Sequence, residues 1–518
     1  MSPEPIQLVW FKRDLRVADH RPLLEATAAG PVLGLYIYEP EILHSPEFDS
    51  AHLVFINECL AELEAAIRDL GGRLITRHGE AVAVLDALAE SLPIAALWSH
   101  AETGNAITYR RDLRVAAWAR RRGLPWREFR QDGVIRRLKN RDGWSARWQR
   151  LMNQPPLPAP SRLQAPKIPV ESAGRLSPEA AGLPRSTKSD VQRGGMKAAV
   201  HTLESFLQHR GVDYRTAMSS PVTAPESCSR LSTYLAYGCI SLRSVFHATR
   251  KRRAELVDQR ETGGDVDRRW FGSIASFEAR LRWHCHFMQK LEDEPRIEFE
   301  NFCRVFDGLR EDFTASAAGR ERLERWKAGM TGYPMVDACM RAVQATGWLN
   351  FRMRAMLVSF AAYHLWLHWR EPAVFLARHF LDFEPGIHFS QFQMQAGTTG
   401  INAMRMYSPA KQVIDQDPHG VFIRRWVPEL AGVPDAWLAE PHLMPLSMQD
   451  RAGCRVGRDY PAPIVDHRDA LAEARRRFAA VRKTPTAREE FARIRERHGS
   501  RKRTTQRKRR VRPTHGCS

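Results

Sequence analysis

The chain has 518 residues, of which 43% are apolar, and carries a formal net charge of +20. Its length allows two or three domains, each with its own core. No apolar run approaches the ~20 residues that span a bilayer, and no signal-peptide pattern opens the chain, so we expect a cytoplasmic protein without a membrane partner. The positive charge favours binding to a polyanion such as nucleic acid.

Eight cysteines are spread along the chain without a CxxC pair or the spacing of a zinc finger. We therefore expect reduced thiols and neither a structural metal nor an iron–sulfur cluster. The cysteines are Cys59, Cys228, Cys239, Cys285, Cys303, Cys339, Cys454 and Cys517.

Residues 6–130 alternate strand and helix patterns. Short apolar runs at 8–11, 32–37 and 95–98 predict buried strands, and residues 54–70 have the apolar spacing of a helix. Such alternation predicts an α/β domain, placed at residues 1–135, with a parallel sheet covered on both faces. No GxGxxG motif is present, so the sequence does not support a conventional dinucleotide site in this domain.

The composition of the chain changes twice after the predicted α/β domain. Four prolines at 155–160 open a segment that cannot be continuous helix, and we assign a linker to residues 136–199. Long helical patterns then predict a large all-α domain at 200–480. Basic clusters at 501–503 and 507–510 predict that residues 481–518 form a disordered tail, which either contacts nucleic acid or is simply a solvated charge run.

Residues 227–232 place hydroxyl groups and Arg230 before a predicted helix. Side-chain donors, a positive charge and free helix N–H groups are the requirements of a pyrophosphate site. Ordinary helix capping by serine is the alternative. We favour the phosphate interpretation.

Four runs carry a family resemblance: residues 10–16 (WFKRDLR), 227–232 (SCSRLS), 346–354 (TGWLNFRMR) and 424–430 (RRWVPEL). Together they resemble the DNA photolyase/cryptochrome family over about residues 6–130 and 200–440. The resemblance implies an α/β parallel-sheet N-terminal domain, which can hold an antenna pigment, and a large all-α domain that binds FAD. The glutamate that holds a folate antenna in some members falls at Thr108, so we doubt a folate antenna, and the antenna stays unknown.

The resemblance also implies a set of FAD-binding residues. Arg354 and Asp382 occupy the positions of a charge pair beside the flavin ring, and His388 replaces the asparagine that faces flavin N5 in repair enzymes. The alternative for His388 is a core histidine bonded to a backbone carbonyl. The full set is Tyr214, Cys228, Ser229, Arg230, Leu231, Ser232, Phe277, His284, Trp348, Phe351, Arg354, Asp382, Glu384 and His388.

Several positions on the implied lesion side depart from the family pattern. Trp283 matches the tryptophan that contacts the lesion, but Arg280 stands where a glutamate is expected, and an arginine can only donate hydrogen bonds. Phe351 replaces an asparagine, and Met394 replaces an aromatic residue. The implied reaction residues are Trp283, Arg280, Arg352, His388 and Trp369.

The family's tryptophan relay to the flavin is interrupted. Trp369 matches the middle member, but Phe392 replaces the member next to the flavin, and Ser316 falls near the outer position. Phenylalanine is much harder to oxidise than tryptophan. Trp366, Tyr363 or Trp270 could form another route, although aromatic residues at helical spacing usually serve packing.

The leading hypothesis is a monomeric, blue-light-dependent DNA photolyase that splits pyrimidine dimers in double- or single-stranded DNA. The alternative is a cryptochrome-like photoreceptor that binds FAD without repair, which the departures at Arg280, Phe351 and Met394 favour. A third reading keeps repair but assigns a different lesion or single-stranded DNA as substrate.

Overall fold

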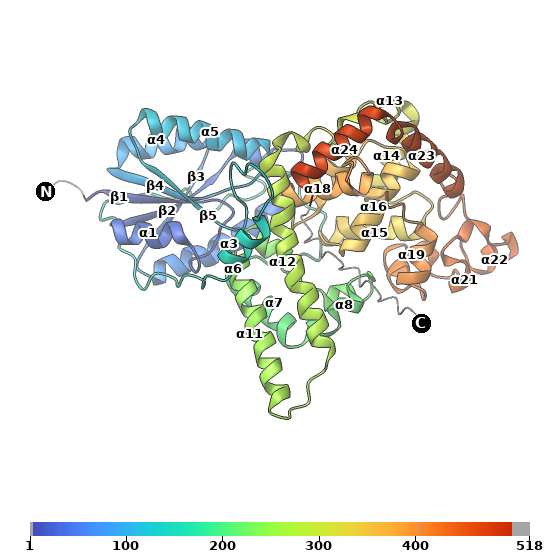
Figure 1. Cartoon of the computed structure of the whole chain (residues 1–518), viewed down its shortest axis with the longest axis horizontal. Helices are drawn as coiled ribbons and strands as arrows, with labels where there is room; N and C mark the ends of the chain where they lie inside the picture. The colour runs from blue at the N-terminus through green and yellow to red at the C-terminus, as the bar shows by residue number, and fades with distance from the viewer. Residues whose placement is uncertain (1–3, 402–403, 500–518) are drawn as a thin grey trace, which may run out of the picture.

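The computed structural model describes residues 4–401 and 404–499, which form an α/β half and a helical half (Figure 1). Five parallel strands make one sheet in the order β3-β2-β1-β4-β5. The strands are β1 (Ile6–Phe11), β2 (Val32–Tyr38), β3 (Arg73–His78), β4 (Ile94–Ala101) and β5 (Trp126–Arg130). The predicted α/β fold class is therefore confirmed, and the predicted runs at 8–11, 32–37 and 95–98 lie in β1, β2 and β4.

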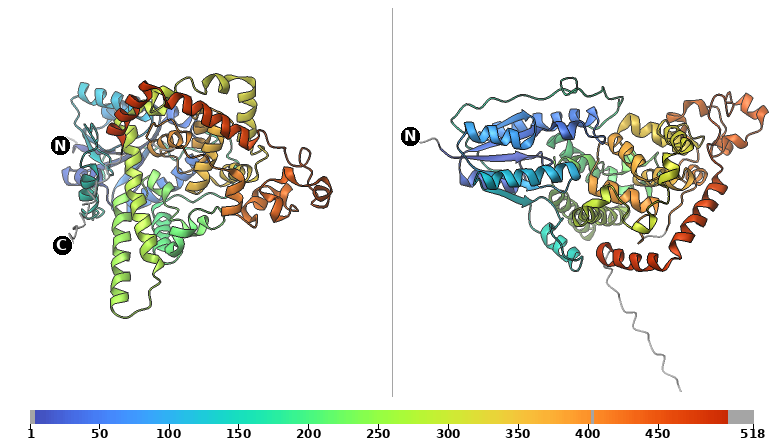
Figure 2. Two further views of the ribbon diagram at one scale, coloured as in Figure 1. Left: turned by 45° about the vertical axis from the view of Figure 1, so that its right-hand side comes forward. Right: turned by 90° about the horizontal axis from the view of Figure 1, so that it is seen from above.

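Helices cover both faces of the sheet. α1 (Arg21–Ala29) and α3 (Ser50–Asp69) lie on one face, and α4 (Ala81–Ser91) and α5 (Ala106–Arg121) lie on the other (Figures 1 and 2). The short α2 (Pro40–Leu43) follows β2. The strand order reverses between β1 and β4, which opens a crevice at the carboxyl ends of the strands, where ligands bind in such sheets.

The linker contains one helix and then returns along the sheet. In α6 (Trp144–Met152) Trp144, Trp148 and Met152 are buried, because their four-residue spacing places them on one face. Farther on, Thr76 of the edge strand β3 accepts a hydrogen bond from the Ala173 backbone at 3.1 Å and donates its hydroxyl to Gly174 at 2.6 Å. The linker thus covers a strand edge that would otherwise expose unpaired backbone groups.

The helical half is built around a core of buried side chains from α15, α16, α17, α18 and α20. α11 and α12 form a long hairpin that projects from the body (Figures 1 and 2). No helix within residues 4–401 or 404–499 is long and apolar enough to cross a bilayer. The helices are α7 (Met196–Gln208), η1 (Arg210–Asp213), α8 (Tyr214–Ala217), α9 (Ala224–Ser227), α10 (Ser232–Ala236), α11 (Leu242–Glu261), α12 (Arg269–Asp293), η2 (Pro295–Glu298), η3 (Arg304–Phe306), α13 (Glu311–Ala315), α14 (Ala317–Lys327), α15 (Pro334–Thr346), α16 (Phe351–Ser359), the π-helix η4 (Phe360–His364), α17 (Arg370–His379), α18 (Pro385–Ala396), α19 (Pro409–Gln416), α20 (Val421–Trp426), η5 (Pro428–Leu430), α21 (Asp435–Leu438), η6 (Pro441–Leu443), α22 (Leu446–Arg451), α23 (His467–Arg482) and α24 (Pro485–His498).

The expectation of a disordered tail from residue 481 is wrong for the described part of that segment. α24 occupies Pro485–His498, with Thr484 capping its first turn through a bond from the Ala487 N–H at 3.2 Å. Ala487, Phe491 and Ile494 are buried on one face of the helix, and the ring of Phe491 stacks on Phe306. Three apolar residues at helical spacing suffice to dock it. The basic clusters at 501–503 and 507–510 lie outside the described residues.

We expect Phe491→Ala to lower the free energy of unfolding of the helical half by about 3 kcal/mol, because it empties a packed aromatic site. Urea unfolding followed by tryptophan fluorescence measures the change. Arg488→Ala, on the exposed face of α24, is the matched control and should change little. Equal effects of the two variants would contradict the docking of α24.

Candidate functional site

The predicted phosphate segment forms a tight turn between α9 and α10. Arg230 has a φ of +59°, a left-handed conformation that costs a non-glycine residue about 1–3 kcal/mol. Two side chains hold the turn in place. Arg210 donates to the Cys228 carbonyl oxygen at 2.7 Å, and Gln192 donates to the Arg230 carbonyl oxygen at 2.9 Å. Within the turn, the Leu231 N–H donates to the Ser229 hydroxyl at 3.5 Å.

Arg354 of α16 and Asp382, in the loop before α18, form a two-point ion pair. Arg354 Nη1 donates to Asp382 Oδ1 at 3.0 Å and Nη2 donates to Oδ2 at 2.9 Å. Nε of Arg354 donates to the Leu349 carbonyl oxygen at 2.8 Å, and the guanidinium lies 3.9 Å from the ring centre of Phe380. These contacts fix the orientation of both charged groups, as the sequence predicted for the pair.

The charge of Arg230, in the turn, also acts on the carboxylate of the Arg354–Asp382 pair. Burial opposes ionisation of Asp382, but the charge and hydrogen bonds of Arg354, a hydrogen bond from Ser232 and the charge of Arg230 hold its pKa below the ordinary value. Arg230 in turn lies 4.0 Å from the ring centre of Trp348, and its buried Nε has no hydrogen-bond partner. Two arginines against one carboxylate, with a donor left free, fit an anionic group such as a pyrophosphate or a reduced flavin.

The inner face of α12 is largely aromatic. The ring of Phe277 packs 5.9 Å from that of Tyr214. Burial raises the pKa of Tyr214 to about 12, against the charge and hydrogen bond of Arg280. His284 lies one turn of α12 beyond Leu281. Burial lowers its pKa to about 4, and its Nδ1 has no hydrogen-bond partner. This face can pack against an aromatic ligand and can offer one imidazole nitrogen to it.

The neighbouring face of α12 is open to solvent. Trp283 is 50% exposed and Phe351 is 42% exposed, although both are large apolar side chains. The guanidinium of Arg280 lies 5.5 Å from the ring centre of Phe351. Arg352, next to Phe351 on α16, has a buried Nε without a partner. An exposed indole beside an arginine–aromatic contact is suited to stacking on a base.

His388 of α18 is hydrogen-bonded to a backbone carbonyl oxygen, as expected for a core histidine. Its Nε2 lies 2.8 Å from the Ala373 carbonyl oxygen and donates to it. Burial lowers the pKa of His388 to about 4, so the imidazole is neutral at pH 7 and does not titrate near neutrality. The ring centre of Phe392 lies 4.6 Å away, and Met394 is buried farther along α18.

Glu384 faces the α/β half of the molecule. Burial raises its pKa to about 7, against the opposing charge of Arg13. Arg13, which follows β1, donates to the Phe383 carbonyl oxygen at 2.5 Å. The segment 382–384 therefore has one carboxylate paired with Arg354 and a second directed towards the other half.

Trp369 and Trp366 lie in different surroundings. Trp369 is buried, and its Nε1 donates to Asn301 Oδ1 at 2.8 Å. Trp366 lies between two guanidinium groups, those of Arg310 at 4.9 Å and Arg477 at 4.8 Å from its ring centre. Two positive charges near the ring disfavour its oxidation.

Tyr363 and Trp270, the other two candidates for an alternative relay, make packing contacts, Tyr363 with Phe478 and Trp270 with Arg252. Ser316, at the outer position of the usual relay, caps α14 by accepting a hydrogen bond from the Gly319 N–H at 3.1 Å. None of these contacts indicates an electron route.

Sequence reasoning missed several residues of the site. Arg210 and Gln192 hold the phosphate turn, but they belong to no motif, and Gln192 lies in the linker. Asn350 could have been found, since it stands inside the quoted run at 346–354. Its Nδ2 donates to the backbone oxygens of Met218 at 3.1 Å and Ser219 at 2.7 Å.

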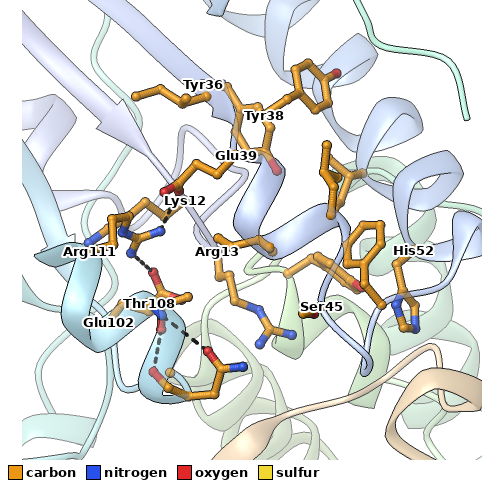
Figure 3. Close-up of a pocket in the computed structure, with 18 of the residues that line it drawn as sticks. Lys12, Arg13, Tyr36, Tyr38, Glu39, Ser45, His52, Glu102, Thr108 and Arg111 are labelled. Carbon is orange, nitrogen blue, oxygen red and sulfur yellow. Dashed lines mark hydrogen bonds and ion pairs between the residues drawn. The ribbon is translucent and has the colours of Figure 1, made fainter. Parts of the chain in front are cut away.

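A separate cavity of about 110 Å³ lies at the carboxyl ends of β1, β2 and β4 (Figure 3). Figure 3 shows Arg13 between Arg111 on one side and His52 on the other. Arg111 donates to Glu39 at 2.8 Å and to Glu102 at 2.6 Å, so its charge is already balanced. Arg13 also lines the cavity, and its guanidinium donates to the Phe383 carbonyl oxygen.

Thr108 lines the same cavity (Figure 3). Its hydroxyl donates to the Asn105 carbonyl oxygen at 3.1 Å. A hydroxyl whose hydrogen is already donated cannot take the part of the carboxylate that holds a folate antenna in some members. That this protein lacks a folate antenna stays a prediction.

Comparison with known proteins agrees with this geometry. Family models described as "DNA photolyase" and "FAD binding domain of DNA photolyase" match residues 7–141 and 277–480. The chain is 30% identical over 515 residues to a deoxyribodipyrimidine photo-lyase of Halobacterium salinarum, covering 92% of this chain and 99% of that protein. The chain belongs to the DNA photolyase/cryptochrome family.

Other members of the family carry both names. A cryptochrome DASH of Gloeobacter violaceus is 29% identical over 488 residues, covering 89% of this chain and 93% of that protein. A crystal structure of a bacterial class III photolyase from Agrobacterium tumefaciens superposes with a TM-score of 0.80 at 27% identity, covering 93% of this chain and 99% of that one. The helical half is thus a photolyase-type FAD-binding domain, and the relatives do not separate repair from light sensing.

The raised pKa of Glu384 predicts a pH dependence of stability. A carboxyl whose folded pKa lies above its unfolded value of 4.5 stabilises the fold fully below pH 4.5, and this contribution is lost as pH rises through about 7. Between pH 5 and 8, the unfolding free energy of the unaltered protein should therefore fall by roughly 2–3 kcal/mol relative to that of Glu384→Gln. Urea unfolding at each pH measures this, with the exposed Glu489→Gln as control; parallel pH profiles for all three would contradict it.

Proposed function

We propose that this protein is a blue-light-dependent, FAD-containing photolyase, a carbon–carbon lyase that splits UV-induced pyrimidine dimers in DNA. The observation that carries the proposal is the half-exposed indole of Trp283, three residues along α12 from Arg280, whose guanidinium contacts Phe351. A large indole left half-exposed offers a stacking surface to an extrahelical base. The net charge of +20 would draw DNA to the protein.

Residues of the helical half would hold FAD. Cys228, Ser229, Leu231 and Ser232, with Tyr214, would contact its phosphates, and Arg230 would balance their charge. The Arg354–Asp382 pair and Trp348 would lie against the flavin, with Phe277, His284 and His388 completing the surroundings of the ring. The neutral His388 keeps Nδ1 as an acceptor, because Nε2 donates to the Ala373 carbonyl oxygen.

Bound FAD, reduced and excited by blue light, supplies the electron that splits the dimer and takes it back afterwards. The protein's part is to place the lesion and to balance charge. Trp283 would stack on the lesion, while Arg280 and Arg352 would donate hydrogen bonds to its carbonyl oxygens or to adjacent phosphates. Arg354, fixed by Asp382, would balance negative charge on the flavin.

A cryptochrome-like photoreceptor is the second candidate. Arg280 occupies the position where repair members have a glutamate, and it contacts Phe351, which itself replaces an asparagine. Met394 is a third position that departs from the pattern of repair members. A photoreceptor would bind FAD in the same residues and would leave the dimer intact.

The proposal is tested by chemical reduction followed by blue light. The purified protein is reduced, which bypasses the interrupted relay, and illuminated with UV-damaged single- and double-stranded oligonucleotides. We expect light-dependent loss of pyrimidine dimers and none in the dark. No repair by protein whose spectrum shows reduced FAD would contradict the proposal and favour the photoreceptor.

A matched pair of variants tests the role of Trp283. Trp283→Ala should weaken binding of dimer-containing DNA by about tenfold or more, since stacking on one base contributes about 1–3 kcal/mol. Trp437→Ala, in α21 outside the site, should leave it unchanged. Fluorescence anisotropy measures both affinities, and the flavin absorbance confirms equal FAD content.

A further inference from the structure

A cavity of about 620 Å³, here called the rear cavity, opens beside Trp348 on the side of the linker and α20. None of Phe277, His284, Asp382 or His388 lines it. Its lining includes Gln192, His201, Arg230, Asn350, Arg425 and Trp426. The volume is that of an ordinary small-molecule site.

Two arginine–tryptophan contacts line the rear cavity. Arg230 lies 4.0 Å from the ring centre of Trp348, and Arg425 lies 5.1 Å from that of Trp426. Indole and guanidinium planes both stack on nucleobases. The left-handed backbone of Arg230 and the bond from Gln192 to its carbonyl oxygen keep the first contact rigid. The cavity therefore offers planar surfaces to a planar ligand.

Two buried polar atoms of the lining lack partners. Asn350 is 2% exposed, and because its Nδ2 donates to two backbone oxygens, its Oδ1 is fixed as an acceptor and is unpaired. Nε of Arg230 is an unpaired donor. Leaving such a group buried without a partner costs about 1–3 kcal/mol, so a ligand that donates a hydrogen bond to Asn350 Oδ1 would gain that energy.

The charge of the lining is positive. Arg210, Arg230 and Arg425 outnumber Asp190 and Glu226, and the imidazole of His201 adds a further donor. Arg210 is engaged with backbone oxygens, but Arg425 is exposed to solvent. An anionic group of the ligand is therefore best placed at Arg425.

We propose that the rear cavity binds a purine nucleotide with an exocyclic amine, of which AMP is the simplest probe. The base would stack on the Arg230–Trp348 contact, its amine would donate to Asn350 Oδ1, and its phosphate would bind Arg425. Arg230 and Trp348 also belong to the expected FAD set, so the two sites would share these residues. The proposal does not depend on repair activity.

Calorimetric titration of the FAD-loaded protein with AMP, IMP and inorganic phosphate tests this site. IMP carries an oxygen in place of the amine, and we expect it to bind at least tenfold more weakly than AMP, because Asn350 Oδ1 would face another acceptor. Inorganic phosphate alone should bind more weakly than AMP. Equal affinity for AMP and IMP, or for AMP and phosphate, would overturn the assignment.

Arg425→Ala should weaken AMP binding about tenfold, whereas Arg451→Ala, an exposed arginine of α22 outside the cavity, should leave it unchanged. Flavin absorbance of each sample confirms that FAD stays bound. Equal AMP affinity of Arg425→Ala and the unaltered protein would overturn the proposal. So would AMP binding only by flavin-free protein, since the cavity would then be part of the FAD site itself.

Discussion

The ion pair of Arg354 and Asp382, in which the carboxylate is buried and the arginine side chain is 26% exposed, is the interaction on which the arrangement of the site depends. Removing two charges from water costs several kcal/mol per ion, and a buried pair regains this only with good geometry. Here the geometry is good, with two parallel bonds and a third from Arg354 to a backbone oxygen. A hydrophobic pair would often stabilise a core equally well, so we propose that the two charges are present for a bound cofactor.

The second constraint is the contact between the two halves. Arg13 follows the central strand β1, reaches the Phe383 carbonyl oxygen and lies close enough to Glu384 to oppose its raised pKa. The residues that follow Asp382 thus form one wall of the cavity in the α/β half.

Much of the fold could be predicted, because buried strands and amphipathic helices leave a clear apolar pattern. β1, β2 and β4 each contain a continuous apolar run, at residues 8–11, 32–37 and 95–98. β3 and β5 are edge strands whose polar residues hide the pattern, and neither was predicted. α24 was assigned to the tail because its many charges hide the three apolar residues that dock it.

The site was predictable residue by residue only where a motif supplied it. Arg354 and Asp382 pair as expected, but their partners Leu349 and Phe380 could not be foreseen, since these depend on tertiary packing. The environment of His388 is likewise tertiary: burial and the Ala373 oxygen decide its protonation. Arg210 and Gln192 come from segments that contain no motif and become part of the site only through folding.

The most direct test of this account replaces the whole ion pair and measures FAD content. Arg354→Met combined with Asp382→Leu removes both members of the ion pair together, so neither is left without the other. Arg230 loses only the charge of Asp382. The protein should therefore stay folded, with a urea midpoint close to that of the unaltered protein. We predict that it nevertheless purifies without FAD and does not take it up when reconstituted. A folded double variant that retains stoichiometric FAD would contradict the claim that the pair is present for the cofactor.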